Sequence, residues 1–176
     1  VITRSAEQAG SFAERLAVLG AEPLLFPVIT FAPSEPESLL AYLKNLDSYA
    51  WIVFTSANAV RFFFEIYDGL DDPPALPRIA AVGQITGDLL QVRSLAPDYV
   101  PDTFTGEALA AGLGDVSGQR VLLPRARAGR PQIVEGLQEQ GALVDDVPLY
   151  ETITAVPTPQ ALAEIKKGVD VVTFTS

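Results

Sequence analysis

Histidine, cysteine and methionine are all absent from this sequence of 176 residues, and the first two absences narrow its chemistry. Without Cys the sequence offers no disulfide, no thiolate metal site and no thiol nucleophile. Without His it lacks the commonest general base, the Ser-His-Asp triad and the usual transition-metal ligand. Acid–base chemistry within this sequence therefore falls to Asp, Glu, Tyr, Lys, the backbone or water.

Long apolar runs are absent too. None approaches the roughly 18–20 residues that span a bilayer, and no charged-then-apolar leader opens the chain. We therefore expect a cytoplasmic protein that does not enter membranes. The missing start Met, and an end inside a predicted strand, indicate a piece of a longer product.

Positive charge is scarce, and the formal net charge is −10. That balance argues against nonspecific binding to nucleic acid or to an anionic membrane. A local site for a small anion remains compatible with it, because most of the 12 cationic residues are Arg, which suits carboxylates and phosphates. With 48% apolar residues, the chain can form a core and is not disordered.

The most informative stretch is Trp51–Val60, WIVFTSANAV. Four apolar residues suit a strand that is buried on both faces, as in a parallel sheet. Ser56 is placed to cap a helix that follows at once. Such a junction aims free backbone N–H groups into the crevice at the carboxyl end of a sheet.

The rest of the chain alternates predicted strands and helices, which is typical of an α/β fold with parallel sheets. Capping boxes are predicted at Ser5 and Ser34, and Pro27 confines its strand to an edge or a bend. Lys166 and Lys167 are expected in the last turn of the final helix. Besides 51–54, the predicted strands are 1–4, 24–31, 79–82, 99–100, 121–124, 143–150 and 169–176.

The sequence also repeats itself. Arg4, the segment 19–21 and the pair 26–27 recur 121 positions later as Arg125, 140–142 and 147–148. The Phe-Thr-Ser of 54–56 recurs at 174–176. We therefore predict two related α/β halves, between which a cleft would form.

These stretches, in this order, resemble the uroporphyrinogen-III synthase family. The matching segments are VITR at 1–4, LGAEPLLFPVI at 19–29, WIVFTSANAV at 51–60, IAAVG at 79–83, DTFTGEAL at 102–109, RVLLPRA at 120–126, VPLYET at 147–152 and VDVVTFTS at 169–176. No single motif is specific, but the ordered set is.

The resemblance implies two flavodoxin-like parallel-sheet lobes, joined by a two-stranded extended linker, with the active-site cleft between them. Lobe 1 would be discontinuous, formed by residues 1–33 and 155–176, with its C-terminal part missing. Lobe 2 would be residues 34–154.

The resemblance also implies a cyclising lyase that needs no metal and no cofactor. Its substrate, hydroxymethylbilane, loses its terminal hydroxyl as water and closes through a spiro intermediate to uroporphyrinogen III, with the last ring inverted. A monomer is expected, receiving substrate from the preceding pathway enzyme. Such catalysis is chiefly conformational, with help to the departing hydroxide.

Tyr150, in the segment that matches VPLYET, is the candidate proton donor, and the alternative is a Tyr ring that merely ends a strand in the core. Ser56 is both a candidate carboxylate ligand and an ordinary helix cap, and the two roles are compatible. The turn after the strand at 121–124 is rich in Arg, with Arg125, Arg127 and Arg130. Of these only Arg125 is predicted to bind the substrate. The predicted substrate-binding residues are Arg4, Thr55, Ser56, Ala57, Asn58, Gly83, Thr86, Arg125 and Ser176.

Another class of function is left open: a non-enzymatic two-lobed protein that binds a small anion by the same strand-end turns. A nucleotide-dependent enzyme is weaker, because neither GxxxxGK nor GxGxxG follows a strand.

Overall fold

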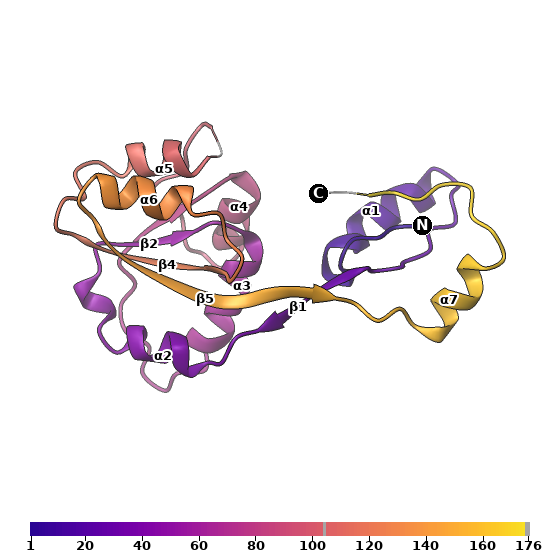
Figure 1. Ribbon diagram of the computed structural model, residues 1–176, viewed down its shortest axis with the longest axis horizontal. Coiled ribbons are helices and arrows are strands. Elements are labelled where there is room, and N and C mark those ends of the chain that lie inside the picture. Colours follow the sequence, from indigo (N-terminus) through magenta and orange to yellow (C-terminus); the bar gives the residue numbers. More distant parts are fainter. Residues whose placement is uncertain (104, 175–176) are drawn as a thin grey trace. The chain divides into compact units, whose positions relative to one another are not determined.

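The computed structural model describes residues 1–103 and 105–174 and divides the chain into two compact units (Figure 1). Unit 1 consists of Val1–Ala32 and Thr152–Ser176, and unit 2 is the continuous segment Pro33–Glu151. No helix in the described ranges is long and apolar enough to cross a membrane. The elements are α1 (Ala6–Val18), β1 (Ile29–Pro33), α2 (Glu37–Leu43), a short 3₁₀ helix (Leu46–Ser48), β2 (Trp51–Phe54), α3 (Ala57–Tyr67), β3 (Arg78–Ala81), α4 (Gln84–Val92), α5 (Gly106–Gly112), β4 (Arg120–Ala126), α6 (Gln132–Glu139), β5 (Leu143–Thr154) and α7 (Pro159–Ile165).

The five strands form one sheet in the order β1-β5-β4-β2-β3. The pairs β2–β3, β2–β4 and β4–β5 are parallel, as predicted. The expectation of a purely parallel sheet is wrong at β1. Ser34 N donates to Leu149 O and Ala155 N to Val28 O, so β1 runs antiparallel to β5. The reason is the chain path, because β1 leaves unit 1 and β5 returns to it.

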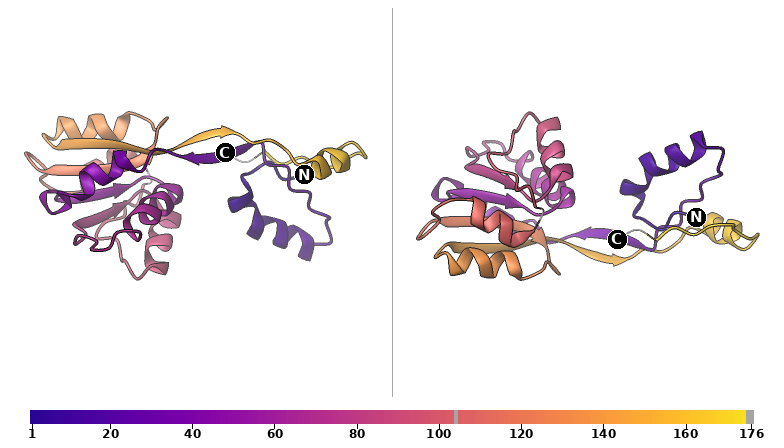
Figure 2. Two further views of the ribbon diagram at one scale, coloured as in Figure 1. Left: turned by 90° about the horizontal axis from the view of Figure 1, so that it is seen from below. Right: turned by 90° about the horizontal axis from the view of Figure 1, so that it is seen from above.

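Helices cover both faces of the sheet in unit 2, which makes this unit a doubly wound α/β layer structure. Figure 2 shows α6 (orange) and α4 (magenta) on opposite sides. On the α5–α6 face, Trp51 and Val53 of β2 pack with Leu109 and Leu137. On the other face, the ring of Phe54 meets Phe63 and Phe64 of α3, with centroids 5.3 and 6.1 Å apart. Both faces of β2 are therefore dry.

The junction between β2 and α3 confirms the prediction made for Trp51–Val60. All four strand residues are buried. Ser56 has an extended backbone and its Oγ accepts a hydrogen bond from Ala59 N at 3.1 Å, which makes it the N-cap of α3.

Unit 1 repeats the strand pairing of unit 2 in the register that the sequence repeat predicts. Ile2 forms parallel bridges with Leu25 and with Thr173. The repeat shift turns the Ile2–Leu25 pair into Leu123 and Asp146, which pair in the β4–β5 ladder. The repeat is therefore structural, although the predicted strands at 1–4 and 169–176 shorten to single bridges.

Three local predictions are wrong. Ser5 precedes α1, but its Oγ is buried without a hydrogen-bond partner among the described residues. Ser34 caps nothing either, because its backbone is bonded to β5 and α2 begins later, after Pro36. Lys166 is the C-cap of α7 rather than part of its last turn, since the helix ends at Ile165.

Candidate active site

A pocket of about 530 Å³ lies in unit 2, at the carboxyl edge of its sheet. The turns that follow β2, β3 and β4 contribute to it, together with the N-cap of α5, the first residues of α6 and one residue of β5. Crevices outside the carboxyl ends of parallel strands are the usual ligand sites of such folds. The lining residues are Thr55, Ser56, Val82, Thr105, Arg125, Ala126, Gly129, Arg130, Gln132, Ile133 and Tyr150.

Tyr150 reaches this pocket because of an irregularity in the strand ladder. Arg125 pairs with Pro148 but Ala126 pairs with Tyr150, so the register shifts by one residue. A β-bulge of this kind changes the direction in which a side chain points. Leu149 and Tyr150 are consequently both buried although they are adjacent in the strand.

The hydroxyl of Tyr150 lies 2.9 Å from Ser56 Oγ, and either oxygen can donate that hydrogen bond. The ring stacks on Phe62 of α3, with centroids 5.1 Å apart, and only 5% of the residue is exposed. Ser56 Oγ already accepts from Ala59 N, which fixes its position. Tyr150 is thus held at both its ring and its oxygen, with its side chain on the pocket wall.

Arg125 is the most engaged charge of the pocket. Its Nε and Nη2 donate to the two carboxylate oxygens of Asp146 at 2.7 and 2.5 Å, and its Nη1 donates to Arg130 O at 2.5 Å. A bidentate fork of this kind is the strong form of an ion pair. Arg125 is only 7% exposed, whereas the Asp146 side chain is 39% exposed, so the pair is shielded from water on the arginine side only.

Among the residues whose side chains the structure describes, the polar part of the lining consists of hydroxyl, amide and guanidinium groups. In a protein with a net charge of −10, the two arginines Arg125 and Arg130 on one pocket wall are a local concentration of positive charge. Such a pocket suits an acidic ligand. Among residues 1–103 and 105–174, no cluster of three or more acidic side chains could hold a metal ion.

Four of the residues predicted to form the site meet in this pocket: Thr55, Ser56, Arg125 and Tyr150. The other predicted residues lie elsewhere. Ala57 and Asn58 occupy the first turn of α3, Gly83 is the N-cap of α4, and Thr86 is almost wholly buried in α4. Arg4 belongs to unit 1, and Ser176 lies outside the described residues.

Several pocket residues were not predicted. Thr105 is the N-cap of α5, since its Oγ1 accepts from Ala108 N at 3.1 Å. Arg130 belongs to the Arg-rich turn but was not among the predicted substrate-binding residues. Gly129 and Gln132 gave no signal of their own, and only the position of their loop after a buried strand could have indicated them.

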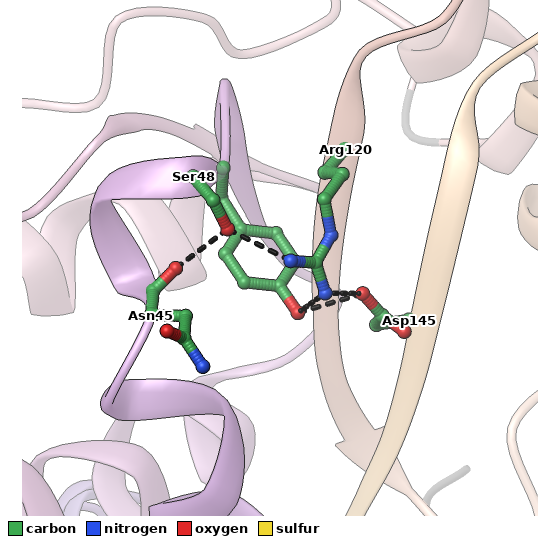
Figure 3. Close-up of polar contacts among 5 residues, drawn as sticks. Asn45, Ser48, Arg120 and Asp145 are labelled. Carbon is green, nitrogen blue, oxygen red and sulfur yellow. Dashed lines mark hydrogen bonds and ion pairs between the residues drawn. The ribbon is translucent and has the colours of Figure 1, made fainter.

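A second polar cluster lies at the amino end of the same strands (Figure 3). Arg120 Nη2 donates to Asp145 Oδ2 and to Tyr49 Oη, both at 2.7 Å, and Tyr49 Oη donates to Asp145 Oδ2 at 2.6 Å. Arg120 Nη1 donates to Ser48 Oγ at 2.8 Å, and Ser48 Oγ donates to Asn45 O at 2.7 Å. The cluster ties β4 and β5 to the segment before β2, away from the pocket.

Burial and the hydrogen bond to Asp145 raise the pKa of Tyr49 above its ordinary value. Partial burial alone would raise the pKa of Asp145, but the hydrogen bonds from Tyr49 and Arg120 outweigh it and the pKa is lowered. The cluster is therefore charged and complete at neutral pH.

The family model described as Uroporphyrinogen-III synthase HemD matches residues 10–176. The chain belongs to the uroporphyrinogen-III synthase family. It is 34% identical over 186 residues to the uroporphyrinogen-III synthase of Synechococcus elongatus, a match that covers 99% of this chain and 69% of that protein.

Two further proteins are similar to this member of the uroporphyrinogen-III synthase family. The porphyrin biosynthesis protein HemD of Ruminiclostridium josui is 35% identical over 158 residues, which cover 86% of this chain and 31% of that protein. A mutant uroporphyrinogen III synthase of the extremely thermophilic bacterium Thermus thermophilus shares the fold with a TM-score of 0.63 and 22% identity, over 94% of this chain and 66% of that one. The chain therefore spans less than a third of the Ruminiclostridium josui protein and about two thirds of the Synechococcus elongatus and Thermus thermophilus proteins.

Proposed function

We propose that the protein carrying this chain is a uroporphyrinogen-III synthase, which cyclises hydroxymethylbilane to uroporphyrinogen III with inversion of the last ring and loss of water. Membership of the family supports the activity. The observation that carries the proposal further is the pocket of unit 2, whose lining combines Tyr150, with its hydroxyl bonded to Ser56, and the arginines Arg125 and Arg130.

The substrate carries an acetate and a propionate on each of its four pyrroles. Desolvating such a polyanion requires donors arranged in advance. Thr55, Ser56, Thr105 and the first-turn N–H groups of α3 are donors of that kind. Ala57 and Asn58 contribute through those backbone N–H groups, and Gly83 and Thr86 through the first turn of α4. Arg4 and Ser176 would contribute from unit 1.

Tyr150 is the proposed proton donor. Loss of the terminal hydroxyl from hydroxymethylbilane leaves an electrophilic azafulvene, and a proton delivered to the departing oxygen converts it to water. Tyr150 lines the pocket, and its hydroxyl is oriented by the hydrogen bond with Ser56. Its ring is held in place because it stacks on Phe62. The last pyrrole then attacks through its substituted carbon, and the spiro intermediate fragments and recloses.

The two units would correspond to the two lobes of the enzyme, joined by the β1 and β5 strands, and the substrate would be held between them. We further propose that the enzyme acts as a monomer and receives hydroxymethylbilane from the preceding enzyme. The fold of a family member supports the two-lobe assignment.

The test is the product isomer. Hydroxymethylbilane closes without an enzyme to isomer I, so the full-length protein should divert it to isomer III. The products are oxidised to porphyrins and separated by chromatography, with a sample lacking protein as the control. Formation of isomer I alone, at the rate without protein, would overturn the enzyme and favour a protein that only binds anions.

A further inference from the structure

Almost all of the described arginines of unit 2 have a carboxylate or an aromatic ring as a partner. Arg61, Arg93, Arg120, Arg125 and Arg127 each have a carboxylate oxygen within 4.0 Å. Arg78 stacks its guanidinium on Trp51, 4.3 Å from the ring centroid. Among the residues that the structure describes in unit 2, Arg130 is the one arginine that has neither a carboxylate nor an aromatic ring.

Arg130 also differs in its place. It is exposed and lines the pocket that Tyr150 shares. An unpaired guanidinium is weakly hydrated, and its planar fork matches a carboxylate in two hydrogen bonds. Because it lines the pocket, it is suited to bind an acetate or propionate group of the ligand.

The position of Arg130 depends on Arg125. Arg125 Nη1 donates to the backbone oxygen of Arg130, while its Nε and Nη2 are fixed by Asp146 of β5. The ion pair with Asp146 thus fixes the guanidinium that holds the loop between β4 and α6 through the oxygen of Arg130. Three of the five N–H groups of Arg125 donate to these partners and Asp146 balances its charge, so the unpaired charge of this wall belongs to Arg130.

Gly129 completes this support. A Cβ at Gly129 would lie 2.5 Å from Nη1 of Arg125 and 2.9 Å from its Cδ and Cζ. Atoms do not approach so closely, so a side chain at this position would displace the Arg125 guanidinium from beneath the loop. Gly129 N also donates to Ala126 O at 3.0 Å, which closes the turn.

We propose that Arg130 binds a carboxylate of the substrate and that Arg125, clamped by Asp146 beneath Gly129, is the positioning residue that presents it. This inference rests on the proposed function, because it assigns the acidic ligand to the same pocket. It changes the role of Arg125 from a ligand-binding residue to a support for one.

The first experiment compares Arg130→Gln with Arg127→Gln in the full-length protein. Both residues are exposed and lie in the same loop, and each substitution removes one positive charge. They differ because Arg127 pairs with Glu151 and is not among the lining residues of the pocket. Uroporphyrin, a stable porphyrin with the same acidic substituents, is titrated by its fluorescence, and KM and kcat are measured with hydroxymethylbilane. Arg130→Gln should weaken Kd and raise KM by about tenfold or more, with kcat little changed. Arg127→Gln should stay within about threefold of the wild type.

The second experiment tests the support. Gly129→Ala leaves Arg125 and Arg130 in the chain but displaces the guanidinium, and it should weaken Kd for uroporphyrin nearly as much as Arg130→Gln does. The double variant should be no weaker than Arg130→Gln alone, because the two changes remove one interaction. Additive losses would overturn the positioning role, and circular dichroism verifies that each variant is folded.

The outcomes separate the inference from the proposed function. If the wild type forms isomer III while Arg130→Gln and Arg127→Gln behave alike, the role of Arg130 is refuted and the enzyme remains. If the wild type neither binds uroporphyrin nor forms isomer III, the proposed function is refuted and the inference with it.

Discussion

Replacing Tyr49 by Phe should destabilise unit 2 by about 1–2 kcal/mol, and the structure gives the reasons for that magnitude. The change removes one hydroxyl, which donates to Asp145 Oδ2 at 2.6 Å and accepts from Arg120 Nη2 at 2.7 Å. A hydrogen bond to a charged group contributes about 1.5–3 kcal/mol. The partners are 37% and 30% exposed, so water replaces part of the loss.

Other interactions at this position survive the substitution. The direct bond between Arg120 and Asp145 remains, and so does the packing of the guanidinium on the aromatic ring, 4.3 Å from its centroid. The ring itself stays buried, at 4% exposure. The loss is therefore attributable to the hydroxyl.

Urea unfolding followed by tryptophan fluorescence measures the effect. Trp51 is the only Trp of the chain and is buried in the core of unit 2, so its emission reports on that unit. Tyr42→Phe is the matched control, because the Tyr42 hydroxyl makes no hydrogen bond among the described residues. It should change the free energy of unfolding by less than about 0.5 kcal/mol.

Acid provides an independent check. Because the folded pKa of Asp145 is lowered, the stability it contributes is present above the unfolded value of about 3.9 and is lost as the pH falls through the folded value. The difference between wild type and Tyr49→Phe should therefore shrink below about pH 4. Equal stability at pH 7, or a difference that persists in acid, would refute the reasoning.

Three further predictions follow from the site and its supports. Tyr150→Phe keeps the stacking on Phe62 but removes the hydroxyl, so kcat should fall by about a hundredfold or more while KM changes less than about threefold. Steady-state kinetics with hydroxymethylbilane measure both constants, and an unchanged kcat would show that Tyr150 is not the proton donor. Gly83→Ala should cost about 1–3 kcal/mol in urea unfolding, since φ is 94° there, whereas Gly87→Ala, whose Cβ would meet ordinary contacts at 3.6 Å, should not destabilise. Above about pH 10 the unfolded chain ionises its tyrosines first, because folding raises the pKa of Tyr49, so the urea midpoint should fall with rising pH, and less steeply in Tyr49→Phe.

The sequence predicted best where local pattern and burial agree. Trp51–Phe54 is apolar throughout and is a strand buried on both faces, and Ser56 caps the helix that follows. The repeat predicted the pairing register of Ile2 with Leu25 as well, since equivalent strands pair equivalently. These features depend on residues close in sequence or on a copy of them.

The parts that were missed depend on partners that are distant in sequence. The role of Arg125 is decided by Asp146 on the next strand, and nothing near Arg125 indicates that pair. Tyr150 enters the pocket through a bulge beside Pro148, which a strand pattern of period two does not show. At Ser34, a bond to β5 prevails over the local preference for a cap.

The duplicated strand end has different electrostatics in its two copies. Arg4 is the counterpart of Arg125, but Leu25 stands where Asp146 does, and Gln8 stands where Gly129 does. Among the described residues no carboxylate pairs with Arg4. The charge of Arg125 is balanced by its bidentate pair with Asp146, whereas Arg4 has no such partner in the described part of the chain. The same repeat position thus stabilises a loop in one copy and, over the described ranges, leaves a positive charge without a carboxylate partner in the other.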